Sequence, residues 1–424
     1  MKVLWFTSGP CEGIDYLVGG KGKTCGWMYS LCQHVRTQSE LELHVAFLWG
    51  HACETFKYRG VIYHPILRKG IDSRIGRYIN LLQGQFSNRQ DHGELHQCVQ
   101  IVREVSPDII HIHGSEDIFG LLTQRDEIAC PIVLSIQGLL SSCQLKYYSG
   151  ISRSELSRSE SIKKRILLSG FDGQFRNLSR RAKREINIFE SLKYVIGRTQ
   201  WDRRCALALN PNIKYFIMNE MLRSEFMSAE WYRHQPQDVF SLVTTISSGI
   251  FKGLEVVYQT AQLLHNSHFE FNWKIIGLSS SDEMVKVVEK MCNMRSNDVH
   301  IELLGTKLAE EMVQIMQQAD VYVQVSHIEN SSNSLCEAMA IGMPIIASNV
   351  GGTSSILQDG IEGVLLQDGN PYELAGAILE AKKNYDCMIR MGENARARAM
   401  KRHNPDRVVH ELMAIYHELE DSSK

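Results

Sequence analysis

Short apolar runs alternate with segments of helical periodicity along the whole chain, and this alternation limits the possible folds most strongly. The runs in the first half start at Lys2, His44, Asp108, Pro131 and Tyr194, and those in the second half start at Phe240, Phe271, His300, Asp320, Met343 and Glu362. Nearly continuous apolar strands are typical of parallel sheets that helices cover on both faces. The sequence therefore predicts an α/β protein with two doubly wound domains.

A polar stretch with neither helical nor strand periodicity separates the two halves. It spans residues 224–238 and includes Pro236, and such breaks are typical of domain boundaries. We predict a first domain over residues 1–225 and a second over residues 226–400. The terminal segment, 401–424, has the pattern of a helix with no strand after it, so it is free to cross back to the first domain.

The composition excludes several classes of protein. The 424 residues include 46 Lys and Arg against 48 Asp and Glu, so the basic excess of a dedicated nucleic-acid binder is missing and no nucleic-acid partner is expected. The 11 cysteines include no C-x-x-C pair, which disfavours a zinc ribbon or a disulfide framework and favours the reducing cytoplasm. No apolar run approaches the roughly 18 residues of a membrane span. Any membrane contact is therefore expected to be peripheral.

A glycine cluster follows the first strand, at Gly19, Gly20 and Gly22. It does not fit a P-loop, because the first required glycine falls on Leu17, and it misses the dinucleotide fingerprint at Cys25. Glycines still permit a close approach of the backbone, and a helix N-terminus favours an anion. The cluster is therefore either a simple turn or a loop that faces a ligand, and we favour the second interpretation.

The strand DIIHIH places His111 and His113 two residues apart, so both project to the same side of the sheet. His113 is nearer the carboxyl end of the strand, where ligands of doubly wound sheets bind. A satisfied structural histidine is the alternative. A zinc pair is disfavoured, because no third ligand stands at a recognisable spacing.

The segment SHIENSSNSLCEAMAIGMPIIASNVGG, residues 326–352, carries the strongest functional pattern. Glu329 lies in a loop after a strand, and Glu337 lies eight residues later in the following helix. A helix N-terminus stabilises a phosphate, and carboxylates accept hydrogen bonds from hydroxyls, so this combination suits a sugar nucleotide. The alternative is a capping box from Ser334 to Glu337, in which Glu337 only closes the start of the helix.

These motifs together resemble family 4 of the retaining glycosyltransferases, whose signature is E-x7-E. The GG-x-G loop, the IIHIHG strand, the pair Lys252-Gly253, EAMAIGMP and NVGG occur in the order of that family. The resemblance implies the GT-B fold, in which two Rossmann-like domains face each other across a cleft. It also implies transfer of a sugar, with retention, from a UDP or GDP sugar to a hydroxyl of a saccharide or lipid-linked saccharide. No cofactor is implied beyond the donor itself.

The resemblance also implies roles for individual residues. Glu329 would contact hydroxyls of the donor sugar, Glu337 the ribose and Lys252 the diphosphate, while His113 would lie near the donor sugar and the acceptor. The glycine loop and the start of the helix would face the sugar and the diphosphate; the residues concerned at the helix start are Asn330, Ser331, Ser332, Asn333, Ser334 and Leu335.

One position departs from the family, which commonly has an arginine where this chain has Ser247. The charge of a departing diphosphate still needs neutralising, and Arg198 or a lysine of the Gly19 loop is a candidate. The chain has no D-x-D pair, so we predict a metal-independent reaction. Two alternatives remain, a catalytically silent sugar-nucleotide binder and a sugar-nucleotide epimerase of the same fold.

The charge of the first half is concentrated in residues 153–204, where 14 Lys and Arg stand against six Asp and Glu. A basic surface of this kind attracts anionic lipid headgroups or a phosphate-bearing acceptor. The alternative is a solvated helix face. We predict peripheral contact with an anionic membrane at its cytoplasmic side.

Overall fold

The computed structural model describes the chain except residues 20–25, 69–88, 161–163, 165–168, 233–237 and 423–424. It divides into two compact units. The first unit consists of Met1–Gln144, Ser161–Met221 and Asn404–Lys424, and the second of Leu145–Glu160 and Leu222–His403. The short segment Leu145–Glu160 lies within the range expected for the first domain, but it belongs to the second unit.

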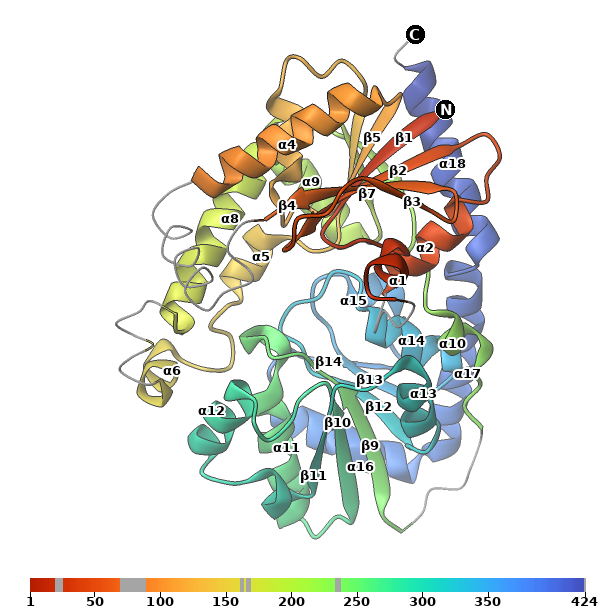
Figure 1. The fold of residues 1–424 in the computed structure, drawn as a ribbon. Coiled ribbons are helices and arrows are strands. Elements are labelled where there is room, and N and C mark those ends of the chain that lie inside the picture. Colours follow the sequence, from red (N-terminus) through yellow and green to blue (C-terminus); the bar gives the residue numbers. More distant parts are fainter. Residues whose placement is uncertain (20–25, 69–88, 161–163, 165–168, 233–237, 423–424) are drawn as a thin grey trace. The chain divides into compact units, whose positions relative to one another are not determined.

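The first unit contains an eight-stranded sheet in the order β3-β4-β2-β1-β5-β6-β7-β8 (Figure 1). Its strands are β1 (Lys2–Thr7), β2 (Glu42–Trp49), β3 (Phe56–Tyr58), β4 (Val61–Leu67), β5 (Ile109–His113), β6 (Ile132–Ser135), β7 (Tyr194–Gly197) and β8 (Lys214–Ile217). Neighbouring strands are parallel except for the pair β3 and β4. The chain proceeds from β1 to one side and returns at β5 on the other, so the strand order reverses between β1 and β5.

Helices cover both faces of this sheet. They are α1 (Gly13–Leu17), α2 (Trp27–Val35), α4 (Arg89–Val105), η1 (Ile118–Gln124), α5 (Leu140–Leu145), α8 (Phe171–Ser191), α9 (Gln200–Leu209) and α18 (Pro405–Asp421). On one face α4, η1 and α8 pack against the side chains of Leu4 and Phe6, and on the other α2 and α18 pack against Val3 and Trp5. Alternate residues of β1 thus enter opposite cores, as the pleat of a strand requires.

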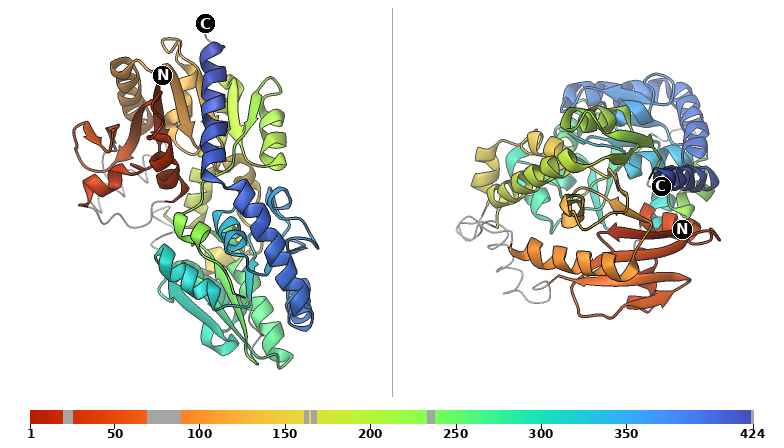
Figure 2. Two further views of the ribbon diagram at one scale, coloured as in Figure 1. Left: turned by 90° about the vertical axis from the view of Figure 1, so that its right-hand side faces the viewer. Right: turned by 90° about the horizontal axis from the view of Figure 1, so that it is seen from above.

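Besides its apolar contacts, the terminal helix α18 places a polar group, the hydroxyl of Tyr416, in the core of the first unit. Tyr416 accepts a hydrogen bond from Trp5 Nε1 at 2.8 Å, and its hydroxyl lies 2.6 Å from His111 Nδ1. All three side chains are fully buried. These hydrogen bonds therefore satisfy polar groups that water cannot reach. Figure 2 shows α18, in dark blue, running along the sheet of the first unit.

The second unit contains a six-stranded, all-parallel sheet in the order β11-β10-β9-β12-β13-β14. Its strands are β9 (Phe240–Thr245), β10 (Phe271–Ile276), β11 (Ile301–Gly305), β12 (Val321–Gln324), β13 (Ile345–Ser348) and β14 (Val364–Leu366). The strand order reverses between β9 and β12. In doubly wound sheets ligands bind at such a reversal, outside the carboxyl ends of the strands.

The helices of the second unit are α6 (Arg153–Ser159), α10 (Ser224–Ser228), η2 (Ile250–Lys252), α11 (Leu254–Asn266), α12 (Glu283–Cys292), η3 (Ser296–Val299), α13 (Ala309–Gln317), α14 (Asn333–Ile341), α15 (Thr353–Ile356), α16 (Pro371–Lys383) and α17 (Tyr385–Arg402). The helix α11 packs against α12 and α16, and α14 packs against α10 and α17. Among the helices that the structure describes, none has the length and apolar character needed to cross a bilayer. The predicted pair of doubly wound α/β folds is confirmed.

Candidate active site

An ion pair lies at the strand reversal of the second sheet. Lys252 ends η2, which follows β9, and Glu329 lies in the loop that follows β12. Lys252 Nζ is 2.6 Å from Glu329 Oε1, and both side chains are largely buried. Because β9 and β12 are neighbours, the two residues singled out from the sequence, 77 positions apart, meet at the expected place.

Two glycines allow the loops around this pair to approach each other. Gly253 has φ +77°, and a Cβ atom there would lie 2.0 Å from the carbonyl oxygen of Val325. Gly351 has φ +51°, and a Cβ atom there would lie 2.0 Å from the carbonyl oxygen of Glu329. No side chain fits at either position, and both backbones lie in the left-handed region that favours glycine. The KG and NVGG motifs are therefore required by the close packing that positions Lys252 and Glu329.

The loop between Glu329 and α14 is polar and buried. Asn330, Ser331 and Ser332 are each less than a tenth exposed. Ser332 is the N-cap of α14, because its Oγ accepts a hydrogen bond from the backbone N–H of Leu335 at 3.4 Å. The nine-residue helix begins at Asn333, so its free amides and positive end lie beside this loop.

Glu337 is not part of a capping box, because the cap is Ser332 and not Ser334. Its carboxylate instead forms a bidentate pair with Arg223, whose Nε and Nη2 donate to the two carboxylate oxygens at 2.7 and 2.8 Å. Burial raises the pKa of Glu337, although Arg223 opposes that shift. Arg223 was missed by sequence reasoning, since it lies 114 residues away and within the range predicted for the first domain.

A second buried network lies under the Glu329 loop. His327 Nε2 is 2.5 Å from Glu255 Oε1, and His327 Nδ1 is 2.6 Å from Asp368 Oδ1. Lys146 Nζ donates to Asp368 at 3.1 Å. Gly150 covers the network with φ +79°, and a Cβ atom there would lie 2.0 Å from Glu255 Oε1. The segment Leu145–Glu160 is therefore attached to the second unit beside the loop that carries Glu329.

The pKa of His327 follows from two opposing effects. Burial lowers it, but the hydrogen bonds and charges of Asp368 and Glu255 outweigh burial and raise the pKa to about 9. The imidazole is therefore a cation at neutral pH. His327 binds the carboxylates of Glu255 and Asp368, and it lies two residues before Glu329. No feature of the sequence pattern had singled it out.

We expect the stability of the protein to depend on the charge of His327. Folding raises the pKa of His327 from 6.5 to about 9. The protonated imidazole therefore makes its full contribution to the free energy of unfolding below about pH 6.5, and this contribution is lost as the pH rises through 9. The shift corresponds to about 3 kcal/mol of unfolding free energy. Urea unfolding of the wild type and of His327→Gln at pH 6 and pH 9.5 measures it. Equal pH dependence in the two proteins would contradict this assignment.

In the first unit, β5 places His111 and His113 side by side, with ring centroids 3.8 Å apart. His111 is structural, since its two nitrogens bond to Tyr416 and to Ser135 Oγ, each at 2.6 Å. His113 is 2% exposed, and neither of its nitrogens has a hydrogen-bond partner among the described residues. The pKa of His113 lies well below its ordinary value, and burial of the ring is the main cause. The neutral ring lies at the end of β5, where the strand order of this sheet reverses.

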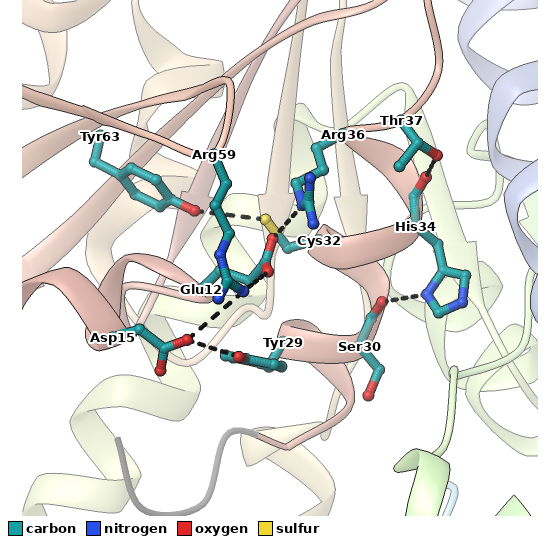
Figure 3. Close-up of polar contacts among 10 residues, drawn as sticks. All are labelled: Glu12, Asp15, Tyr29, Ser30, Cys32, His34, Arg36, Thr37, Arg59 and Tyr63. Carbon is teal, nitrogen blue, oxygen red and sulfur yellow. Dashed lines mark hydrogen bonds and ion pairs between the residues drawn. The ribbon is translucent and has the colours of Figure 1, made fainter. Parts of the chain in front are cut away.

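The loop after β1 is held by a buried carboxylate (Figure 3). Glu12 is fully buried, and it accepts hydrogen bonds from Arg36 Nε at 2.7 Å and from Arg59 Nη1 at 2.9 Å. Tyr29 donates to Asp15 at 2.8 Å beside this cluster. The charge of Glu12 is thus paired on both oxygens, which a buried carboxylate requires. The cluster joins the start of α1 to α2 and to the strand pair β3 and β4.

The glycine loop itself is described in part. Gly19 follows α1 with φ +72°, in the left-handed region. Gly20, Gly22 and the two lysines of the loop lie outside the described residues. The proposed contact of this loop with a ligand remains a prediction.

The loop after β5 is held by α8. The carbonyl oxygen of Glu116 accepts hydrogen bonds from Arg181 and Arg184, and Glu185 accepts one from Ser115 Oγ at 2.5 Å. Burial raises the pKa of Glu116 to about 7. A carboxyl group of this pKa, three residues after His113, can hold or release a proton near neutral pH. Glu116 could not be singled out from the sequence, because no local pattern around it indicates that its carboxyl group is buried.

The basic segment 153–204 is divided between the two units. Arg153 and Arg158 lie in the second unit, in α6. Arg198 is buried in the first unit, 3.6 Å from Glu220 and stacked over Trp27. Within the first unit, Arg176 and Lys183 of α8 are exposed, and the predicted contact of this segment with a membrane remains a prediction.

The position of Ser247 is exposed, in the loop after β9. Arg198, one of the two candidates to replace the missing arginine, already interacts with Glu220 and Trp27. Its charge is therefore engaged within the first unit. The lysine alternative lies outside the described residues.

Two α/β units, each built on a largely parallel sheet with a reversal of strand order, are the elements of the GT-B fold. Residues 242–398 match the family model described as "Glycosyl transferases group 1". The match lies within the second unit and confirms the resemblance found from the sequence. A glycosyltransferase of Methanocaldococcus jannaschii is 31% identical over 175 residues, which are 41% of this chain and 48% of the relative. The chain thus matches about half the length of such curated relatives.

Solved structures share the fold over the whole chain. Sucrose-phosphate synthase of Thermosynechococcus elongatus is similar with a TM-score of 0.73 and 14% identity, and the similarity covers 100% of both chains. HepE of Anabaena, solved in complex with UDP-glucose, has a TM-score of 0.64 and 14% identity over 99% of this chain and 100% of its own. At these identities the likeness defines the fold, and the predicted GT-B architecture is confirmed.

Proposed function

We propose that the protein is a retaining glycosyltransferase that uses a nucleotide-diphosphate sugar. The observation that carries the proposal is the Lys252–Glu329 pair at the strand reversal, beside the buried polar start of α14. A cation and free helix amides suit a diphosphate, and a carboxylate suits sugar hydroxyls. The UDP-glucose complex of the structurally similar HepE supports a UDP sugar as the donor. A GDP sugar is the alternative donor.

The proposed reaction needs no protein nucleophile. The bond between the anomeric carbon and the diphosphate breaks, and the acceptor oxygen bonds to the same face of that carbon. The acceptor proton goes to an oxygen of the departing diphosphate. Lys252 and the N-terminus of α14 neutralise the developing charge, while Glu329 orients the donor sugar. Glu337, held by Arg223, binds the ribose, and the neutral His113 offers a hydrogen bond to a sugar hydroxyl.

Differential scanning fluorimetry with UDP, GDP, ADP and CDP sugars tests donor binding, because a ligand of the folded state raises its apparent stability. Donor hydrolysis then separates an enzyme from a silent binder, and NMR of the product determines the anomeric configuration. A donor that binds without being hydrolysed or transferred would favour the silent binder, for which Ser247 is the motivation. An inverted product would exclude the retaining mechanism.

We expect transfer to continue in excess EDTA. The chain has no D-x-D pair, and Lys252 with the start of α14 supplies positive charge that a divalent ion supplies in other enzymes. Rates measured before and after chelation, with EDTA removed by dialysis as the control, should agree within about twofold. Complete loss of transfer that Mg²⁺ or Mn²⁺ restores would make the reaction metal-dependent.

The proposed acceptor is a saccharide or lipid-linked saccharide of cell-surface polysaccharide synthesis, used at the cytoplasmic side of the membrane. The exposed cations of α8 support this, since each well-placed cation contributes about 1 kcal/mol of attraction to anionic lipid. We expect the protein to sediment with anionic vesicles at low salt but neither with neutral vesicles nor at high salt. Equal, negligible sedimentation with both kinds of vesicle would leave a soluble acceptor.

A further inference from the structure

The first unit contains a cavity of about 480 Å³ among α4, η1 and α8, apart from the residues assigned above to the donor. Five cationic side chains line it: Arg125, Arg180, Arg181, Lys183 and Arg184. Its described lining includes no carboxylate. Like charges repel one another, and a bound anion would offset the repulsion among these cations.

The cations of the cavity differ in what they already bind. Arg181 and Arg184 hold the carbonyl oxygen of Glu116 and thereby fix the inner side of α8. Arg180 Nη1 is buried and makes no hydrogen bond within the described part of the chain. Among the described residues, none forms an ion pair with Arg180, Lys183 or Arg125. Three positive charges of the cavity are therefore available to a ligand.

The lining specifies the chemistry of that ligand. Guanidinium groups match phosphate oxygens in pairs of parallel hydrogen bonds, which makes arginine the preferred partner of phosphate groups. Leu95 and Leu121 supply an apolar wall beside the cations. The volume is in the range of sites that take small organic ligands. We propose that this cavity binds the phosphate or diphosphate group of a phosphorylated ligand.

The site is connected to the proposed chemistry through α8. The same helix carries Arg180 toward the cavity and holds Glu116, three residues after His113. A phosphate in the cavity is thus bound by the helix that positions the loop after β5. The ligand is either a phosphorylated acceptor, which rests on the proposed function, or a free phosphorylated metabolite.

Calorimetric titration with pyrophosphate tests the site without any need for sugar transfer. All proteins carry Lys252→Ala, so that the proposed donor diphosphate site does not contribute. The test variant is R180Q/K183Q, which leaves the two arginines that hold Glu116 in place. The matched control is R176Q/K193Q, which removes the same charge at residues outside the cavity. Arg125→Gln, at the end of η1, is a second test from another element.

We expect R180Q/K183Q to weaken pyrophosphate binding about tenfold or more, and R176Q/K193Q to change it less than about twofold. Arg125→Gln should weaken binding in the same direction. Unchanged binding by R180Q/K183Q, or equal weakening by the control, would overturn the proposal. Arg125→Gln keeps the test decisive if the double variant fails to fold.

Vesicles distinguish the source of the phosphate. Phosphatidylcholine vesicles with phosphatidic acid present a phosphomonoester, and those with phosphatidylglycerol present a phosphodiester of like sign. Displacement of pyrophosphate by the first kind alone indicates a lipid-borne phosphate, and displacement by neither indicates a soluble ligand. Either result supports the site. If the Lys252→Ala protein binds pyrophosphate here but the wild-type protein transfers no sugar, this site stands and the proposed function fails.

Discussion

Replacing Lys252 by alanine is expected to lower the rate of sugar transfer about 100- to 1,000-fold. Lys252 is the cation at the strand reversal of the second sheet, and removal of one group that stabilises developing charge has an effect of this size. Affinity for the nucleoside diphosphate should fall about 10- to 150-fold, since a hydrogen bond to a charged group is lost. Steady-state kinetics and calorimetry measure the two effects.

Two further variants sharpen this prediction. Lys401→Ala removes an exposed lysine of α17 in the same unit and should leave both quantities unchanged. Glu329→Ala should lower turnover as Lys252→Ala does but should not weaken binding of the nucleoside diphosphate. It can even strengthen that binding, because it frees Lys252 from its 2.6 Å ion pair. If Glu329→Ala loses diphosphate affinity as severely as turnover, Glu329 does not act on the sugar.

The second large effect is expected at the Arg223–Glu337 pair. Either residue replaced by alanine leaves its buried partner unpaired, which costs about 3–5 kcal/mol of unfolding free energy. Glu337→Ala should also lower nucleotide affinity about 10- to 150-fold, because the bond to the ribose is lost. Urea unfolding and calorimetry with the nucleoside diphosphate measure the two effects separately.

The double variant R223M/E337L separates stability from binding. Replacing a buried ion pair by apolar groups of similar volume is often neutral for stability, so the double variant should regain most of the stability that either single variant loses. Nucleotide affinity should stay low, because no carboxylate remains for the ribose. Restored affinity in the double variant, or unchanged affinity in Glu337→Ala, would make Glu337 a purely structural residue.

The sequence was sufficient for the features that local pattern encodes. The apolar runs that predict β1, β9 and β12 are buried on both faces and form parallel strands. Lys252 and Glu329 were found because parallel strands end at one edge, so residues that follow neighbouring strands meet there. The glycines of KG and NVGG were visible as motifs, and the structure supplies the two close carbonyl oxygens that explain them.

The partners of these residues were decided by tertiary packing. Arg223 reaches Glu337 across 114 positions, and Glu12 is paired by Arg36 and Arg59 from two other elements. The choice of Ser332 over Ser334 as the cap of α14 depends on the backbone conformation at the helix start.

The cationic cavity of the first unit has the same origin. The sequence showed an excess of positive charge in residues 153–204. Only packing decides which of these cations bind other groups of the protein and which face the cavity. It turns Arg181 and Arg184 toward a backbone oxygen and buries one nitrogen of Arg180 beside α4 and η1. The net charge of a segment can be counted from its residues alone. Which of its charged side chains are buried or paired depends on which distant elements pack together. The sequence therefore determined the α/β alternation and the motifs, and tertiary structure decided which charges are paired and which face a cavity.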